Sequence, residues 1–245
     1  LKDFMAGGRE LAHAELIGAL LIAGFGTLIS LFPFHSWAAP AYTSAPAPVA
    51  MMHAGVLKKF GLYGLFMFQP LMETGFLPWT NILLVLLVCN VIWVGYVTVN
   101  QKRLDLLLGN SSVMHMGYIF LAFAALVASG SAEANPWALK GAALLMLAHG
   151  LTIALLFLLC GQIEKQTGTL EINSLGGLST RLPRMAFVFG LAGMASIGLP
   201  GLANFPGEFM VFFSGFAGFN DSFGPVQIAT ILCLWGLVIG AVYML

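Results

Sequence analysis

The stretch that decides the fold is residues 185–213, MAFVFGLAGMASIGLPGLANFPGEFMVFF. Its two ends are apolar enough to belong to one membrane-crossing helix, but Pro200, Pro206 and several glycines interrupt it in the middle. An interrupted helix leaves backbone N–H and C=O groups unpaired, and hydrocarbon tolerates such groups only where they face protein or a water-filled cavity. The stretch therefore predicts a broken membrane helix that restarts at Glu208 inside a larger bundle.

The composition of the 245-residue chain excludes a soluble globule. Hydrophobic residues make up 59% of it and charged residues only 8%, against roughly 25% charged residues in an ordinary soluble domain. The net charge is 0 and basic residues do not cluster, which excludes a nucleic acid as partner. Three cysteines lie in apolar runs without metal-type spacing. We therefore expect an integral membrane protein that lies in a lipid bilayer and has neither a metal nor another cofactor.

The fold class predicted from the hydropathy pattern is all-α, a polytopic transmembrane helix bundle. A window of about 19 residues finds about seven apolar stretches, each close to the roughly 20 residues that cross a bilayer. The proline-rich, charge-free segment Ala38–Pro48 is expected to be a loop between the first two. The spans are expected at about Glu15–Leu31, Val49–Phe68, Asn81–Val99, Leu106–Val127, Trp137–Gln162, Met185–Phe219 with its interruption, and Gln227–Leu245.

Two of these spans are interrupted by proline at comparable points. The first is interrupted at Phe32-Pro33-Phe34-His35, and the sixth within residues 198–207. A pair of broken helices in corresponding positions indicates an ion or substrate path built on inverted repeats. Simple proline kinks are the alternative interpretation of the same pattern.

The ends and connections of the chain give weaker information. Residues Leu1–His13 carry charges and lack the cleavage pattern of a signal peptide, so we expect a connecting segment within a longer protein. Five lysines and arginines lie in the third–fourth and fifth–sixth connections, and three lie on the opposite side. This bias places those two connections in the cytoplasm or in a matrix-like compartment. We expect the membrane to be a bacterial inner membrane.

Ionisable residues inside the apolar stretches are the functional candidates, because a charge at membrane depth costs about 2.5–3.5 kcal/mol on insertion scales. Together they form the set of groups that a proton relay needs. For each histidine the alternative is a structural bond to a backbone carbonyl, and for the glutamate it is a helix cap. Ser111 and Ser112 are expected to hold water against one of the rings. The candidates are Lys59, His53, His115, His149, Glu208 and His35.

Two adjacent lysines, Lys58 and Lys59, lie in the second span. Successive helical residues project about 100° apart, so we expect only one of them to face a cavity. We assign that role to Lys59 and expect Lys58 to snorkel or to pair. The chain contains no motif for a redox centre and none for hydrolysis.

Several motifs, in order and at near-constant spacing, resemble one known family. They are residues 33–37 PFHSW, 45–49 APAPV, 53–64 HAGVLKKFGLYG, 111–118 SSVMHMGY, 148–152 AHGLT, 176–178 GGL and 198–209 GLPGLANFPGEF. The chain is similar to the antiporter-like membrane subunits of respiratory complex I (NADH:quinone oxidoreductase) and of the multisubunit cation/proton antiporters. Its NFPGEF ending makes it resemble the chain M type of complex I subunit most.

The resemblance implies a fourteen-helix subunit of inverted repeats, of which residues 14–70 would end the first repeat and residues 80–245 form the second. It also implies a mid-membrane line of protonatable residues, driven by quinone chemistry elsewhere in a complex. By motif match Lys59 and Glu208 fall on the family's central lysine and broken-helix glutamate, with His115 and His149 between them. His53 falls where the sister chain L type has its histidine, and His35 falls on the family's histidine of the first break.

One departure from the family pattern leaves the function open. Leu28 stands where the family places a lysine, seven residues before His35. Three functions are therefore weighed. The first is a proton-translocating subunit, without a redox site of its own, among the membrane subunits of a complex I-like oxidoreductase. The second is a sodium/proton antiporter subunit, and the third is a scaffold that has lost transport.

Overall fold

The computed structural model describes residues 13–217 and 223–244, and within these ranges it contains helices and no β-strand. This confirms the all-α fold class. The predicted connecting segment lies outside the described residues except for His13. The α-helices are α2 Ala14–Ile29, α3 Ala38–Ser44, α4 Ala47–Met52, α5 Lys58–Phe68, α6 Glu73–Phe76, α7 Thr80–Val99, α8 Leu104–Ser129, α9 Pro136–Thr167, α10 Leu178–Arg181, α11 Pro183–Ser196, α12 Asn204–Gly215 and α13 Pro225–Met244.

Within residues 13–217 and 223–244, four segments are long and apolar enough to cross a membrane as single helices. They are Thr74–Val99, Leu104–Ser129, Pro136–Thr167 and Pro225–Met244. The other three predicted spans are built from shorter pieces. The 16-residue α2 is one, α4 and α5 joined by the π-helical turn His53–Leu57 form another, and α11 with α12 forms the third.

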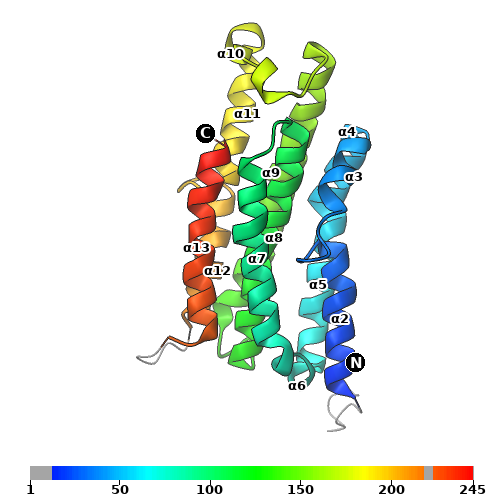
Figure 1. Cartoon of the computed structure of the whole chain (residues 1–245). Helices are drawn as coiled ribbons and strands as arrows, with labels where there is room; N and C mark the ends of the chain where they lie inside the picture. The colour runs from blue at the N-terminus through cyan, green and yellow to red at the C-terminus, as the bar shows by residue number, and fades with distance from the viewer. Residues whose placement is uncertain (1–12, 218–222, 245) are drawn as a thin grey trace.

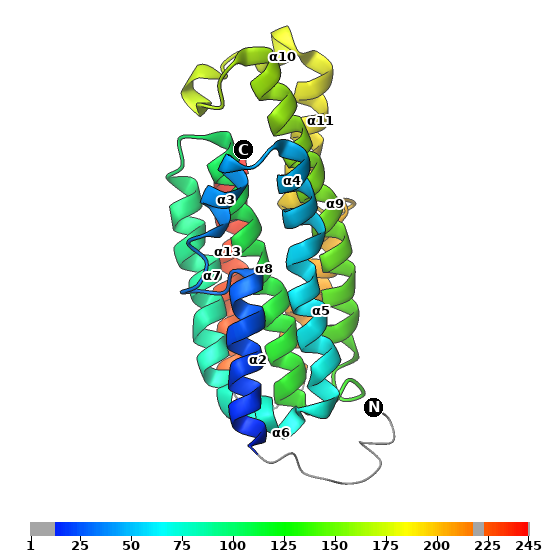
Figure 2. The same ribbon diagram turned by 90° about the vertical axis from the view of Figure 1, so that its right-hand side faces the viewer.

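Helix α8 lies in the middle of the bundle. It packs against α3, α5, α7, α9, α12 and α13, and 94% of its most apolar window is buried inside the protein. The views of Figures 1 and 2 show the other long helices running along it, with α13 on the far side from α2. Because α8 has no lipid-facing side, its polar residues can be satisfied only by other helices or by internal water.

Both predicted breaks are confirmed. Helix α2 ends at Ile29 and α3 begins at Ala38, after Ser30 has taken a left-handed conformation with φ 71°. Helix α11 ends at Ser196, and Gly198 with φ 77° starts the turns that lead to α12. Glycine adopts this conformation without strain, which explains why it stands at the second break.

The expectation of a loop over Ala38–Pro48 is wrong, because residues Ala38–Ser44 form the helix α3. Pro40 lies in the first turn of α3, where a backbone N–H has no partner within the helix and its loss costs nothing. The buried Ala38, Ala39 and Tyr42 pack α3 onto α8. Without charges, and with alanine at two of its three buried positions, this segment fits tightly against the bundle.

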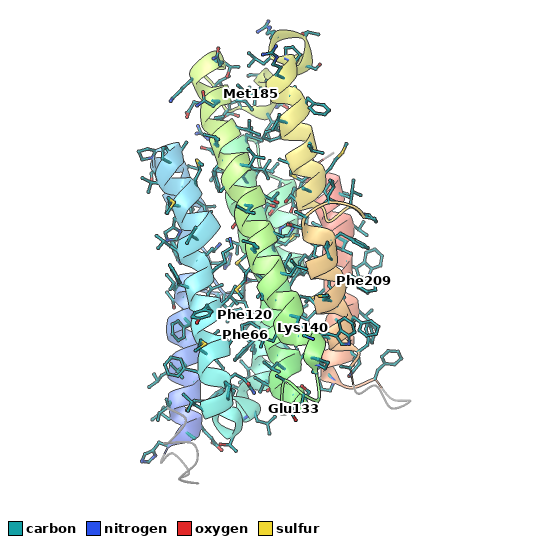
Figure 3. The ribbon with its side chains drawn as sticks, turned by 180° about the vertical axis from the view of Figure 1, so that it is seen from behind. Phe66, Phe120, Glu133, Lys140, Met185 and Phe209 are labelled. Atoms are coloured by element: carbon teal, nitrogen blue, oxygen red, sulfur yellow. The ribbon has the colours of Figure 1, made fainter. Side chains whose placement is uncertain are left out.

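The two connections expected on one side of the membrane do lie side by side. The Leu104 N–H donates to the Leu170 carbonyl at 2.9 Å, and the Ile172 N–H donates to the Lys102 carbonyl at 2.9 Å. Met185, at the start of α11, marks this end of the bundle, and Glu133 marks the opposite end (Figure 3). Which compartment this end faces remains a prediction.

Helices α9 and α12 approach closely at Gly207. A Cβ atom built on Gly207 would lie 2.8 Å from the Leu145 Cα atom and 2.8 Å from its nitrogen. Small residues at such crossings let helix backbones pack together within a membrane. This contact fixes the position of α12 against α9.

We expect Gly207→Ala to destabilise the protein by about 1–3 kcal/mol, because the added methyl group meets backbone that cannot move aside. The measurement is the thermal unfolding of the complete protein in detergent or lipid. Gly190→Ala is the matched control, since nothing lies within 4 Å of a Cβ at that position. Equal unfolding temperatures for the two variants would contradict the close packing of α9 and α12.

Candidate functional site

Lys59 is buried between α5 and α9, with 7% of its surface exposed. Its Nζ donates a hydrogen bond to the carbonyl of Ala54, five residues earlier. Ala54 lies in the π-helical turn His53–Leu57, where the ordinary helical hydrogen-bond register is interrupted. A π-turn within an α-helix frequently marks a functional position. The irregular turn thus supplies the acceptor that a buried ammonium group needs.

The π-turn passes very close to α9. A Cβ on Gly55 would lie 3.0 Å from the Gly150 carbonyl oxygen, and a Cβ on Gly150 would lie 2.6 Å from the Gly55 carbonyl oxygen. Side chains at either position would force the two segments apart. The two glycines therefore bring Lys59 to the segment that carries His149, since a Cβ on Gly150, the neighbour of His149, would lie 3.9 Å from the Lys59 Cε.

His149 is fully buried on α9. Neither of its ring nitrogens has a hydrogen-bond partner among the described residues. Its ring stacks on that of His115, with ring centroids 4.9 Å apart and an interplanar angle of 14°. A structural histidine bonded to a carbonyl, the alternative weighed from sequence, does not describe His149.

His115, on α8, is held through both ring nitrogens. Its Nδ1 lies 2.8 Å from the Ser111 carbonyl and its Nε2 lies 2.9 Å from the Ser196 carbonyl. Carbonyl oxygens only accept, so a neutral ring can donate one of these bonds and the doubly protonated ring can donate both. The hydrogen-bond pattern of His115 is therefore tied to its protonation state.

The Ser111 and Ser112 hydroxyls make no direct hydrogen bond to this ring within the described part of the chain, and the water expected between them and the ring stays a prediction. The Ser111 hydroxyl is 2.8 Å from the Tyr243 hydroxyl, and the Ser112 Oγ is buried without a hydrogen-bond partner among the described residues. The ring instead bonds to the Ser111 backbone carbonyl. The spacing along α8 placed Ser111 correctly beside the ring, but the carbonyl of that residue is nearer.

Glu208 lies on α12 with 3% of its surface exposed. One of its carboxylate oxygens, Oε1, is 3.9 Å from the His115 Nε2 and has no hydrogen-bond partner among the described residues. The helix begins at Asn204 and not at Glu208 as predicted, because Pro206 is tolerated in a first turn. Glu208 is thus one turn inside α12, and no capping bond to it is present in the described part of the chain.

The break between α11 and α12 forms one wall of this site. Ser196 is the last residue of α11, and its carbonyl accepts the bond from His115 and faces the Asn204 amide nitrogen at 3.5 Å. Gly198 faces the Glu208 carboxyl group, and a Cβ there would overlap the carboxylate oxygens. The glycine and the freed carbonyl together make room for the carboxylate beside the ring.

His53 and His35, the other two candidates, lie outside this row. The His53 Nδ1 is 3.2 Å from the Tyr42 hydroxyl, and the His35 ring stacks on Phe32 with centroids 5.3 Å apart. No hydrogen bond among the described residues joins either of them to Lys59 or His149. The sequence grouped six residues, and the structure brings four of them together.

The expectation that Lys58 snorkels or pairs is wrong. Lys58 has 0% of its surface exposed, and its Nζ has no hydrogen-bond partner among the described residues. The reason is that protein covers two faces of this helix. Helix α9 covers the face of Lys59, and the Tyr42 ring of α3 covers that of Lys58, whose Nζ lies 5.7 Å from the ring centroid.

Asn90, which the sequence analysis did not single out, holds the first break in place. Its side-chain oxygen accepts a bond from the Phe32 N–H at 2.6 Å, and its nitrogen donates to the Ser30 and Val113 carbonyls at 3.2 and 3.3 Å. The signal in the sequence is an amide in the middle of an apolar run. This one side chain joins α7 and α8 to the end of α2.

The fold and the site together define a polytopic membrane protein with a buried row of protonatable side chains. The family model described as NADH:quinone oxidoreductase/Mrp antiporter, transmembrane region, matches residues 2–233 of the chain. The chain belongs to this family, as its motifs implied. It is therefore an integral membrane protein.

Curated relatives include two cyanobacterial subunits. A Synechocystis protein named NAD(P)H-quinone oxidoreductase chain 4-2 is 37% identical over 247 residues, which cover 100% of this chain and 42% of the relative. A Synechococcus protein named NAD(P)H-quinone oxidoreductase chain 4 1 is 33% identical over 248 residues, which cover 100% of this chain and 45% of that relative. The chain thus spans less than half the length of these relatives.

Solved structures show the same arrangement of helices. A chain of respiratory complex I from Thermus thermophilus with bound NADH superposes with a TM-score of 0.86 at 27% identity, over 99% of this chain and 49% of that chain. A chain of the Mrp complex from Dietzia gives a TM-score of 0.77 at 21% identity, and the match covers 93% of this chain and 41% of that chain. The second likeness concerns the fold alone.

We expect Asn90→Leu to destabilise the first break, at about 1–3 kcal/mol for each buried backbone group left without a partner. The measurement is hydrogen–deuterium exchange of the complete protein, in which the Phe32 amide should exchange faster. Asn81→Leu is the control, because Asn81 is exposed on the same helix. Unchanged exchange at Phe32 in Asn90→Leu would show that the break is held by other contacts.

Proposed function

We propose that this chain carries protons across the membrane along Lys59, His149, His115 and Glu208. The observation that supports this most directly is the stacking of His149 on His115, with Glu208 3.9 Å from the His115 ring nitrogen. These four groups lie on α5, α9, α8 and α12, and all are buried. An apolar bundle has no structural need for such a row, because each member costs free energy to bury.

The first steps of the proposed path lead from Lys59 to the two rings. A proton on Lys59 passes to His149, whose ring nitrogens have no competing partner among the described residues. Stacked rings do not point their nitrogens at each other, so the next step to His115 uses a bridging water molecule or a rotation of one ring. The polar, unpaired atoms of His149 and Ser112 are suited to bind such a water.

The last step leads from His115 to Glu208. When His115 carries two ring protons, it donates to the Ser111 and Ser196 carbonyls together. Transfer of the Nε2 proton to Glu208 neutralises both groups and releases the Ser196 carbonyl at the end of α11. The hydrogen bonding at the break between α11 and α12 therefore changes when the proton moves.

The sequence contains no redox motif, so in a redox-driven pump the energy for transport would come from partner subunits. The relatives named NAD(P)H-quinone oxidoreductase chain 4 and the likeness to a chain of complex I support an assembly of the complex I type. We propose other membrane subunits of such an NADH:quinone oxidoreductase as the partners, in a bacterial membrane. No cofactor is proposed within this chain.

A sodium/proton antiporter subunit is the second candidate. It is favoured by the description of the family, which includes Mrp antiporters, and by the fold shared with the Dietzia Mrp complex. A scaffold that has lost transport is the third, favoured by Leu28. The row of buried groups favours transport, and the dependence of transport on sodium separates the first two candidates.

We expect Lys59→Met and Glu208→Gln each to lower NADH-driven proton uptake about tenfold or more, since a barrier raised by about 1.4 kcal/mol slows a step tenfold. Each variant removes one proton-binding group and keeps the size of the side chain. The measurement is proton uptake by membrane vesicles, normalised to the amount of assembled complex. The wild type should pump equally well without sodium.

Lys140→Met is the matched control, because Lys140 is exposed on α9 near the end marked by Glu133 (Figure 3). It should pump as the wild type does. Normal pumping by both Lys59→Met and Glu208→Gln would refute the proposed path. Uptake that requires sodium would favour the antiporter, and a wild type without any transport would favour the scaffold.

A further inference from the structure

The proposed path leaves one buried charged residue without a role, namely Lys58. It has no exposed surface and no hydrogen-bond acceptor for its Nζ among the described residues. Burying an ammonium group without a partner is among the costliest arrangements in a protein. A methionine or leucine would fill the same space without this cost, so packing does not account for a lysine here.

The Tyr42 side chain connects Lys58 to His53. The Lys58 Nζ lies over the Tyr42 ring at 5.7 Å from its centroid, and the Tyr42 hydroxyl lies 3.2 Å from the His53 Nδ1. The Tyr42 ring packs against the Phe157 ring, with 5.3 Å between centroids. It also packs closely on Gly109, where a Cβ would lie only 3.3 Å from the Tyr42 Cδ2 atom. Three groups that can exchange protons therefore meet at the contact between α3 and the π-turn.

This cluster has an outer and an inner end. His53 is partly exposed, while Tyr42 is 4% exposed and Lys58 is fully buried. Lys58 is followed directly by Lys59, the first member of the proposed path, and the two interact electrostatically. Figure 2 shows α3 and α4 in the upper part of the bundle, with α5 continuing from α4 toward the opposite end, where α6 lies. The order from outside to inside is therefore His53, Tyr42, Lys58 and Lys59.

We propose that His53, Tyr42 and Lys58 form an entry branch that delivers protons to Lys59. This inference rests on the proposed function. In the transfer, the doubly protonated His53 ring loses its Nδ1 proton to the Tyr42 oxygen and becomes neutral, and the Tyr42 hydroxyl gives its own proton to the neutral Lys58 amine. The flexible Lys58 side chain swings from the face of the ring to its hydroxyl edge to accept that proton.

The second transfer passes the proton from Lys58 to the neutral Lys59 amine. Tyr42 ends unchanged, His53 has lost one proton and Lys59 has gained one, so the steps balance. Two ammonium groups side by side repel each other, which prevents both lysines from holding a proton at once. That repulsion drives the proton already on Lys59 onward to His149 when the next one reaches Lys58.

The test compares variants of the complete protein in its assembled complex. Lys58→Met removes the amine, and Tyr42→Phe removes only the hydroxyl and keeps the ring under Lys58. We expect each to lower NADH-driven proton uptake about tenfold, as expected when one transfer step is lost. The double variant should pump no worse than the more severe single variant, because both act on one branch. Tyr63→Phe, at an exposed tyrosine, is the control.

Lys58→Arg separates proton transfer from a structural role. Arginine keeps a cation over the Tyr42 ring but does not release its proton, so the branch predicts uptake as low as in Lys58→Met. Wild-type uptake in Lys58→Arg, or in both Lys58→Met and Tyr42→Phe, would overturn the branch. If Lys59→Met still blocks uptake in that case, the proposed function stands. If Lys59→Met and Glu208→Gln both pump normally, the proposed function itself fails.

Discussion

The rest of the structure depends on the complete enclosure of one helix, α8, within an apolar bundle. A helix in a membrane can carry polar side chains at mid-depth only where protein or internal water surrounds it. Because α8 is covered on all sides, His115 can lie at the centre with a stacked ring from α9 and a carboxylate from α12. The packing of the other helices around α8 is what turns separate ionisable residues into a continuous row.

Irregular backbone supplies the acceptors that this row needs. The π-turn offers the Ala54 carbonyl to Lys59, and the end of α11 offers the Ser196 carbonyl to His115. Both irregularities lie where other helices cover them, as hydrocarbon requires. Each also creates a group whose hydrogen bond can be made or lost as a proton moves. The structural cost and the proposed proton transfer thus fall on the same few residues.

Much of this could be predicted from the sequence, because membrane spans depend on length and hydropathy, which are local properties. The two breaks followed from proline and glycine, and the scarcity of charge singled out Lys59 and Glu208. The sequence could not place Tyr42 or Asn90, whose roles depend on which helices become neighbours. It also missed α3 and the burial of both lysines, because an apolar proline-rich segment folds there only through its contact with α8.

The measurement that tests the account most directly is infrared difference spectroscopy of the assembled complex containing the full-length protein during NADH-driven turnover. If protons pass along the row, the Glu208 carboxyl group is protonated and deprotonated in each cycle. We predict a carboxylic acid band that changes during turnover in the wild type and is lost in Glu208→Gln. The same band in Glu208→Gln, or turnover with pumping and no carboxyl signal in the wild type, would contradict the account.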